Sequence, residues 1–479
     1  MDEQRASIVW LRHDLRLADN SALVAAVERD CPVVCVFIWV PEEEGDWPPG
    51  AASRWWLHHS LASLDAELRE RGSRLIVRRG PSLQALTSIA AETNADTVYW
   101  NRRYEPAVVR RDAQVLRSLK AAGIGVEHSN SALLFEPHDV QTGQGKPYQV
   151  FTPFWKACLA KPAPTEPLPA PAKIPGPATW PESLTIDELQ LLPRIPWDRG
   201  FYDVWRPGEP AALEELSAFV AERIGEYSRA RDVPAEPGTS RLSPRLHFGE
   251  VGPRQVWWEI RNSKSETRNG PPVAGGDAFL REIGWREFAY HILHHFPQTT
   301  RAPLRDRFER FPWRKDVAAL KAWQQGRTGY PIVDAGMREL WQTGWMHNRV
   351  RMIVGSFLTK DLLVSWTEGA RWFWDTLVDA DLANNTLGWQ WIAGCGADAA
   401  PYFRIFNPVS QGEKFDASGR YVRRWVSEIC GLPDSLVHEP WSADADELGR
   451  AEVTLGDNYP APIVDHAEAR KRALEAYGR

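Results

Sequence analysis

The stretch GYPIVDAGMRELWQTGWMHNRVRMIVGSFLTKDLL, residues 329–363, lies within a long region of helical periodicity that begins near residue 209. Trp345, Asn348, Arg349 and Met352 fall at i, i+3, i+4 and i+7, so the spacing predicts that one helix face presents all four side chains. Asn and Arg are costly to bury without polar partners. The pattern therefore favours a ligand-binding face, with stacking from Trp and Met and a phosphate contact from Arg.

Toward the N-terminus, the first 130 residues alternate β-branched runs with helical stretches. We expect strands at residues 8–11, 33–39, 75–78, 97–100 and 125–128, and helices at residues 53–71, 81–92 and 106–122. Such alternation predicts a parallel sheet covered by helices on both faces. The first strand-to-helix turn, WLRHDLRLADN, contains no glycine, and GxxxxGK[ST] occurs nowhere in the chain, so an ordinary dinucleotide or P-loop site is excluded.

A proline-rich segment separates the two patterns, with eight prolines in residues 162–181. Proline breaks helices and cannot complete a central strand, so we expect an extended connector over the surface. The fold class is therefore α/β plus all-α. We expect an α/β domain over residues 1–131, a linker over 132–208 and an all-helical domain over 209–479.

The composition is that of a globular protein outside the membrane. No stretch approaches the roughly 18 consecutive apolar residues that a membrane helix needs, and the acidic start does not resemble a secretory signal. The cysteines are too scattered for a disulfide framework, which predicts reduced thiols and a cytoplasmic location. They are Cys31, Cys35, Cys158, Cys395 and Cys430. A net charge of −6 does not exclude nucleic acid, because residues 399–426 hold five cations against two acids and could form a local basic face.

Three further motifs have both a functional and a structural interpretation. In residues 278–293, Glu282, Trp285 and Arg286 share a helix face, although Glu282 and Arg286 could form a surface ion pair instead. In residues 377–415, Asp379 and Asp381 could act as acid and base. The lack of a nearby His and the amides Asn384 and Asn385 argue against a metal. The glycines at 388, 394 and 396 allow a bulky group to approach. GTSRLSP, residues 238–244, could be a phosphate cradle or a helix cap.

Long motifs spread over the whole chain make it similar to the photolyase/cryptochrome family. They are WLRHDLRLADN, TGYPIVDAGMREL, GWMHNRVRM, ADAAPYFRIFNP and PYFRIFNPVSQGEKFD. PGAASRWWLHHSLASLD and FTPFWKAC look closer to class III cyclobutane pyrimidine dimer photolyases and plant cryptochromes than to class I enzymes. The resemblance implies an antenna-binding α/β domain, an FAD-binding helical domain, and light-driven repair of dimers by electron transfer from reduced FAD to a flipped-out lesion.

The resemblance also implies which residues bind FAD. They are Tyr227, Thr239, Ser240, Arg241, Leu242, Ser243, Phe279, Glu282, Arg286, Trp345, Asn348, Arg351, Asp379, Asp381 and Asn385. Arg351 would pair with Asp379. Asn385 would face the flavin nitrogen that gains or loses a proton. Because an amide there cannot protonate that nitrogen as the aspartate of plant cryptochromes can, it should favour the anionic reduced flavin used in repair.

A second set matches the family's contacts with damaged DNA. It comprises Arg231, Glu282, Trp285, Asn348, Arg349, Met352, Trp391, Arg404 and Gln411. Trp285 and Trp391 would form the walls around the extruded dimer, and Glu282 would hydrogen-bond it. The catalytic residues would be Glu282, Asn348 and Asn385. Trp389, Trp366 and Trp313 match an electron-transfer chain from surface to flavin, and Trp372 and Trp374 could offer a second route.

Some alternatives stay open on the sequence alone. The rival function is a cryptochrome-type blue-light photoreceptor without repair activity, although the chain ends about 60 residues after its last motif without a low-complexity tail. Repair of the (6-4) photoproduct is disfavoured because those enzymes place a histidine where Asn348 stands. The antenna is expected to be a folate, methenyltetrahydrofolate, with a deazaflavin or none as alternatives. We expect a monomer that binds damaged DNA, no metal and no membrane.

Overall fold

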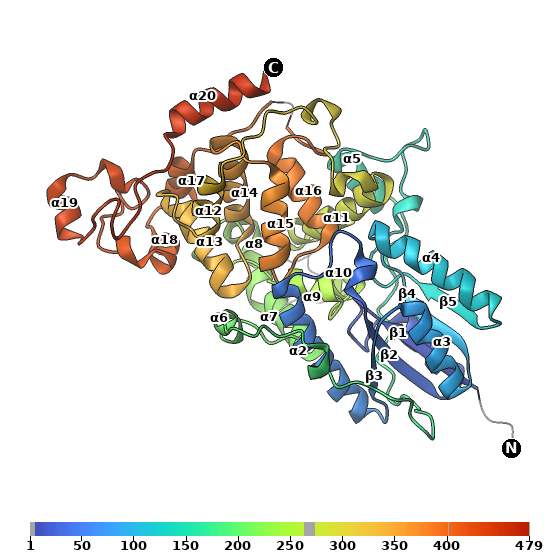
Figure 1. Ribbon diagram of the computed structural model, residues 1–479. Coiled ribbons are helices and arrows are strands. Elements are labelled where there is room, and N and C mark those ends of the chain that lie inside the picture. The colour runs from blue at the N-terminus through green and yellow to red at the C-terminus, as the bar shows by residue number, and fades with distance from the viewer. Residues whose placement is uncertain (1–4, 263–273, 401, 479) are drawn as a thin grey trace.

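The computed structural model describes residues 5–262, 274–400 and 402–478. An α/β domain built from the N-terminal part of the chain packs against one side of a larger helical domain (Figure 1). Within the described residues, none of the helices combines the length and the apolar character that crossing a membrane requires.

The α/β domain contains a five-stranded sheet in which every pairing is parallel. Its strands are β1 (Ala6–Leu11), β2 (Val33–Trp39), β3 (Leu75–Arg79), β4 (Ala95–Asn101) and β5 (Gly125–Ser129). They lie in the order β3-β2-β1-β4-β5, so β1 is central. Ile8 of β1 pairs with Val34 on one side and Val98 on the other. Each predicted strand is present, with bounds that differ from the expected ones by two residues or fewer.

The side chains of β1 alternate between two hydrophobic cores, one on each face of the sheet. Val9 and Leu11 join the core that contains α2 (Ala51–Glu70) and α1 (Ser21–Val27). Ile8 and Trp10 join the core beneath α3 (Ser82–Thr93) and α4 (Pro106–Ala121). This period of two is what a strand buried on both faces requires. The prediction of helices on both faces of the sheet is confirmed.

The connector between the domains is less free than its prolines suggested. Residues 162–181 contain no helix or strand, as predicted, but the Val33 N–H donates to the Pro175 carbonyl (2.7 Å) and Ile174 is fully buried. Upstream, α5 (Phe151–Leu159) lies inside the expected linker, yet its apolar face joins the core of the helical domain. The segment 132–208 is therefore partly integrated into both domains.

The helical domain follows, with only isolated β-bridges in its described part. Its helices, together with the short α6 that precedes them, are α6 (Arg199–Tyr202), α7 (Glu209–Ala218), α8 (Tyr227–Ala230), α9 (Ser243–Phe248), α10 (Pro253–Asn262), α11 (Gly276–His295), α12 (Val317–Gln324), α13 (Pro331–Thr343), α14 (Asn348–Ser356), α15 (Trp366–Thr376), α16 (Leu382–Ala393), α17 (Pro408–Phe415), α18 (Arg420–Trp425), α19 (Ala445–Arg450) and α20 (His466–Tyr477). Helices α11, α14, α15 and α16 pack together at its centre.

The prediction that Trp345, Asn348, Arg349 and Met352 share one helix is wrong. Helix α13 ends at Thr343, and Gly344 adopts a left-handed conformation (φ 68°) that suits a glycine at a helix end. Helix α14 begins at Asn348, where the Nδ1 atom of His347 accepts a hydrogen bond from the Arg349 N–H (3.2 Å). Trp345 therefore lies in the turn between two helices.

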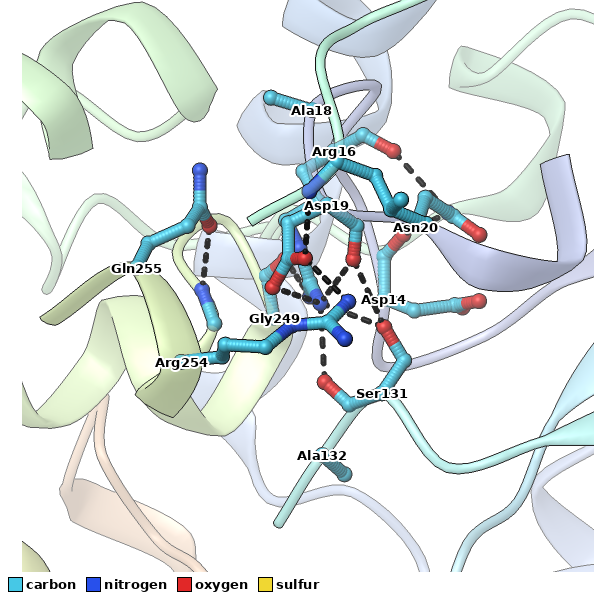
Figure 2. A network of polar contacts seen from close by, with 12 residues as sticks. Asp14, Arg16, Ala18, Asp19, Asn20, Ser131, Ala132, Gly249, Arg254 and Gln255 are labelled. Carbon is cyan, nitrogen blue, oxygen red and sulfur yellow. Dashed lines mark hydrogen bonds and ion pairs between the residues drawn. The ribbon is translucent and has the colours of Figure 1, made fainter. Parts of the chain in front are cut away.

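A buried polar junction joins the two domains (Figure 2). Arg16, in the turn after β1, is 1% exposed and donates to the carbonyls of Gly249 (2.9 Å) and Ser131 (2.8 Å). Arg254 of α10 forms an ion pair with Asp19. At Gly249 an added Cβ would lie 2.2 Å from the His13 carbonyl oxygen, so only glycine permits this approach. The junction fixes the α/β domain against the end of α9.

Candidate active site

A cavity of about 570 Å³ opens at the centre of the helical domain. Its walls come from α8, from the loop before α9, and from α11, α14, α15 and α16. All the residues expected to bind FAD line it, although they come from segments far apart in the sequence. So do Arg231, Trp285, Arg349, Met352, Trp389 and Trp391.

One end of the cavity is formed by the loop of residues 239–243, which was expected to hold phosphates. Arg241 adopts a left-handed conformation (φ 55°). Its guanidinium group lies between the rings of Trp205 and Trp345, with centroid distances of 4.3 and 4.9 Å. The Nε atom is buried without a hydrogen-bond partner. An arginine held by stacking, with nitrogen atoms left to donate, is suited to an anionic ligand.

Asp379 lies next to this loop and connects three elements. Its Oδ2 atom accepts hydrogen bonds from the Ser243 hydroxyl (2.6 Å) and from Arg351 Nη2 (2.8 Å), the pair implied by the resemblance. Its Oδ1 atom is buried without a partner. A buried carboxylate oxygen normally has a donor, so this atom is free to accept a hydrogen bond from a bound ligand.

Asp381 caps α16 and is held by several donors. Its Oδ1 atom accepts from the N–H and the side-chain amide of Asn384 (2.9 and 2.7 Å), and its Oδ2 atom accepts from the Tyr290 hydroxyl (2.5 Å). His247 Nδ1 lies 3.5 Å from the same Oδ2. Burial alone would raise the pKa of Asp381, but its bonds with His247 and Tyr290 and the nearby Arg286 hold that pKa well below its usual range. Asp381 is therefore an anion that organises the cavity wall.

These features fit a large ligand that carries both anionic groups and hydrogen-bond donors, as FAD does. Arg241 offers cationic nitrogen atoms, and Asp379 offers an acceptor without a partner. At Gly388, in the middle of α16, an added Cβ would meet nothing within 4 Å, so the wall leaves open space there. Asn385 also lines the cavity and directs its side-chain amide to the Ala370 carbonyl (3.0 Å).

Two half-buried tryptophans stand at the cavity as expected for the lesion-binding walls. Trp285 stacks on Phe151 of α5, with ring centroids 3.9 Å apart and an angle of 9° between the planes. Trp391 lies beneath the guanidinium group of Arg404, 5.5 Å from its ring centroid. Trp391 and Arg404 also line a small adjoining cavity. Gln411, on α17, lines neither cavity, so a contact between Gln411 and DNA outside the cavity stays a prediction.

The mouth of the cavity is its partly exposed edge, where Glu282 and Arg231 lie. The ion pair there differs from the one that the helical spacing suggested. Glu282 pairs with Arg231 at 2.7 Å, not with Arg286 four residues along its own helix. Arg286 instead turns inward and donates to the Ala132 carbonyl (2.7 Å). The ion pair ties α11 to the end of α8 at the edge of the cavity.

The three tryptophans expected to transfer electrons belong to one hydrophobic cluster. Trp389 (3% exposed) lines the cavity, Trp366 (4% exposed) is buried in the cluster without lining the cavity, and Trp313 is half-buried and packs against the cluster. Trp372 and Trp374 pack against the same cluster. Trp372 stacks on Trp341 (6.1 Å between centroids, 6° between planes), and Trp374 packs against Trp47. An electron-transfer route through Trp389, Trp366 and Trp313 stays a prediction.

Sequence reasoning missed two polar residues of the cavity wall. His247 lies four residues after Ser243, so it follows the loop of residues 239–243 by one helical turn, and it contacts Asp381. Asn384 was noted only as evidence against a metal, yet it lines the cavity and holds Asp381. The i, i+4 spacing from Ser243 could have identified His247.

Comparisons with known proteins agree with this geometry. A family model described as DNA photolyase matches residues 7–172, and one described as the FAD binding domain of DNA photolyase matches residues 279–479. A deoxyribodipyrimidine photo-lyase of Agrobacterium fabrum is 49% identical over 98% of this chain and 97% of its own length. Cryptochrome-1 of Arabidopsis thaliana is 42% identical over 98% of this chain and 70% of its own length.

A solved structure described as a bacterial class III photolyase from Agrobacterium tumefaciens is also similar. It is 48% identical, covers 100% of this chain and 98% of its own, and has a TM-score of 0.95. The predicted architecture, a parallel α/β domain followed by a helical domain, is thereby confirmed. The chain belongs to the photolyase/cryptochrome family, and its helical half is the FAD-binding domain of that family.

Proposed function

We propose that this chain is a deoxyribodipyrimidine photo-lyase that repairs cyclobutane pyrimidine dimers in DNA. One observation carries the proposal: a single cavity holds the candidate FAD residues along its walls and two half-buried tryptophans with Glu282 at its mouth. The high identity to a photo-lyase over nearly the full length of both chains supports the same activity.

Two of the groups that would hold the cofactor, Arg241 Nε and Asp379 Oδ1, lack hydrogen-bond partners in the protein alone. Arg241 and the hydroxyls of residues 239–243 would bind the FAD phosphates. The Oδ1 atom of Asp379 would accept a hydrogen bond from the cofactor, and the ion pair with Arg351 would hold that carboxylate in place. Reduced FAD, once excited by light, would lend the dimer the electron that opens the cyclobutane ring and would recover it when the ring has split. The protein's own contribution is orientation and electrostatics.

The lesion would enter from the mouth of the cavity. A dimer must leave the base stack to be reached, and a damaged pair costs less to unstack than an intact one. Trp285 and Trp391 would pack against the extruded dimer, with the stacked Phe151 keeping the Trp285 ring in place. Glu282, Asn348 and Met352 would contact the bases. Arg231, Arg349, Arg404 and Gln411 would contact the DNA around the lesion.

The competing function is a photoreceptor without repair activity, since cryptochromes are also similar to this chain. Asn385 favours repair. Its amide donates to the Ala370 carbonyl, and an amide has no acidic proton to give to a flavin nitrogen. The electron-transfer chain of Trp389, Trp366 and Trp313 suits either function and does not discriminate between them.

The finer properties complete the proposal. We propose a methenyltetrahydrofolate antenna, for which a deazaflavin or no pigment are the alternatives. The absorption spectrum of the purified protein distinguishes the three. We further propose a monomer in the cytoplasm, where the five free cysteines would stay reduced.

The decisive experiment measures repair directly. The purified protein is reduced, mixed with an oligonucleotide that contains one thymine dimer, and illuminated with blue light. Loss of the dimer in the light, with none in a dark control, is the expected result. A protein that binds FAD and undergoes photoreduction without repairing the dimer would instead support the photoreceptor.

A further inference from the structure

Two adjacent residues after α8 form ion pairs of opposite polarity at the mouth of the cavity. Arg231 pairs with Glu282 of α11 at 2.7 Å, whereas Asp232 pairs with Arg349 of α14 at 2.8 Å. The charge of Asp232 also acts on Arg231 and on the buried His347. Burial lowers the pKa of His347 to about 4, so Arg349 is the cation that Asp232 neutralises at neutral pH.

Arg349 is held in place from several directions, and Asp232 takes only one of its nitrogen atoms. The guanidinium group stacks on Phe415, 4.4 Å from the ring centroid, and Nη1 lies 3.8 Å from the Met352 sulfur. Nη2 donates to Asp232 Oδ1, while Nε is buried without a partner. The stacking and the sulfur contact would keep the guanidinium group in position if Asp232 released it.

We propose that Asp232 stands in for a DNA phosphate on Arg349 until damaged DNA binds, and thereby sets the discrimination between damaged and undamaged DNA. This inference rests on the proposed function, since it assumes that Arg349 contacts DNA. A sliding duplex meets an arginine whose charge is already neutralised. Only a strand anchored at the mouth by an extruded dimer binds tightly enough to displace Asp232.

The exposure of the pair makes such an exchange feasible. The Asp232 side chain is 41% exposed and that of Arg349 20% exposed. Partly exposed ion pairs contribute little to stability, so separating Asp232 from Arg349 costs little. Contact with a phosphate releases counterions from the DNA and makes binding salt-dependent. An Arg349 freed from Asp232 would gain this contact with any DNA, damaged or not.

The test replaces Asp232 with asparagine, which keeps the size and removes the charge. The control is Glu92→Gln, which removes one charge from the Arg78–Glu92 pair (2.5 Å) of the α/β domain, where the exposures of 19% and 31% are similar. Binding of the FAD-loaded proteins to undamaged and dimer-containing oligonucleotides is measured by fluorescence anisotropy over a range of salt concentrations.

We expect Asp232→Asn to tighten binding to undamaged DNA about fivefold. This factor corresponds to the upper end of the free energies found for exposed ion pairs. The slope of log K against log salt should steepen by about 0.9, as for one added phosphate contact. Binding to dimer DNA should tighten less, so the preference for damage falls. Glu92→Gln should change none of these quantities, and repair by Asp232→Asn should persist.

The inference is overturned if Asp232→Asn leaves binding to undamaged DNA and its salt slope unchanged, or tightens both DNAs equally. It is also overturned if Asp232→Asn has the same effect in an Arg349→Ala background, because the effect must act through Arg349. Failure of the proposed function is recognised separately: the unsubstituted chain would then show no preference for dimer DNA.

Discussion

Replacing Glu282 with alanine tests the lesion contact that we propose for this carboxylate. Glu282 lies at the mouth of the cavity, pairs with Arg231 at 2.7 Å and has 29% of its side chain exposed. A partly exposed ion pair contributes about 1 kcal/mol or less to stability. We therefore expect Glu282→Ala to fold with nearly unchanged stability and to keep its FAD.

The effect on repair should be much larger than the effect on folding. A hydrogen bond to a charged group is worth about 1.5–3 kcal/mol, and about 1.4 kcal/mol corresponds to a factor of ten. Losing the bond between Glu282 and the dimer should therefore lower the efficiency of repair by roughly 10- to 100-fold. Glu282→Gln keeps the size and an acceptor oxygen without the charge. Its repair efficiency should therefore lie between those of the unsubstituted protein and Glu282→Ala.

The assay measures dimers repaired per absorbed photon at limiting and saturating DNA, together with the flavin absorbance per protein. Glu428→Ala is the matched control, because Glu428 pairs with Arg338 at 2.8 Å with 28% of its side chain exposed and lies outside the cavity lining. Repair by Glu282→Ala at the level of this control would refute the lesion contact. Loss of flavin from Glu282→Ala would instead mean that Glu282 holds the cofactor.

Three further substitutions test other parts of the site. Gly388→Leu should lower FAD occupancy, because the leucine side chain would enter the open cavity. The apoprotein should be no less stable, and up to about 1 kcal/mol more stable, because leucine favours a helix over glycine. Flavin absorbance and thermal unfolding measure the two effects. Trp389→Phe should keep FAD but slow photoreduction, followed by flavin absorbance under illumination, because phenylalanine fills most of the space against Gly369 without a redox-active indole. Burial raises the pKa of Glu287 to about 7 from 4.5. The contribution of Glu287 to the free energy of unfolding is therefore fully present below pH 4.5 and is lost as the pH rises through about 7. Glu287→Gln should remove this change, on the order of 3 kcal/mol, from unfolding free energies measured between pH 4.5 and 8.

Local features of the fold followed closely from the sequence. Four of the five strands of the α/β domain contain two or more β-branched residues, and β5 contains one, Val126. All five expected runs match the observed bounds within two residues. The break between α13 and α14 was missed because Trp345, Asn348, Arg349 and Met352 keep helical spacing across it. Gly344 and His347 were the available signals, as a helix end and a helix cap.

Contacts between distant segments were less accessible. Spacing within one helix suggested a pair between Glu282 and Arg286, but Glu282 meets Arg231, 51 residues earlier. The stacking of Phe151 on Trp285 likewise joins the expected linker to α11. Such pairings depend on how helices cross, and periodicity describes only the face that a single helix presents. The family resemblance supplied the site residues that periodicity could not bring together.

The charge distribution at the mouth also explains how a chain of net charge −6 could bind a polyanion. Arg231 and Arg349 each have one carboxylate partner, Glu282 and Asp232, and both pairs are partly exposed. Binding therefore exchanges one anion for another rather than bringing phosphates to unneutralised cations. The exchange gains little for DNA that only passes over the surface. The free energy gained is larger for a strand whose extruded bases also occupy the cavity. Those bases can donate a hydrogen bond to the Glu282 carboxylate once Arg231 has released it. On this argument, specificity arises because the acids at the mouth weaken non-specific binding, and one of them is used again when the lesion enters.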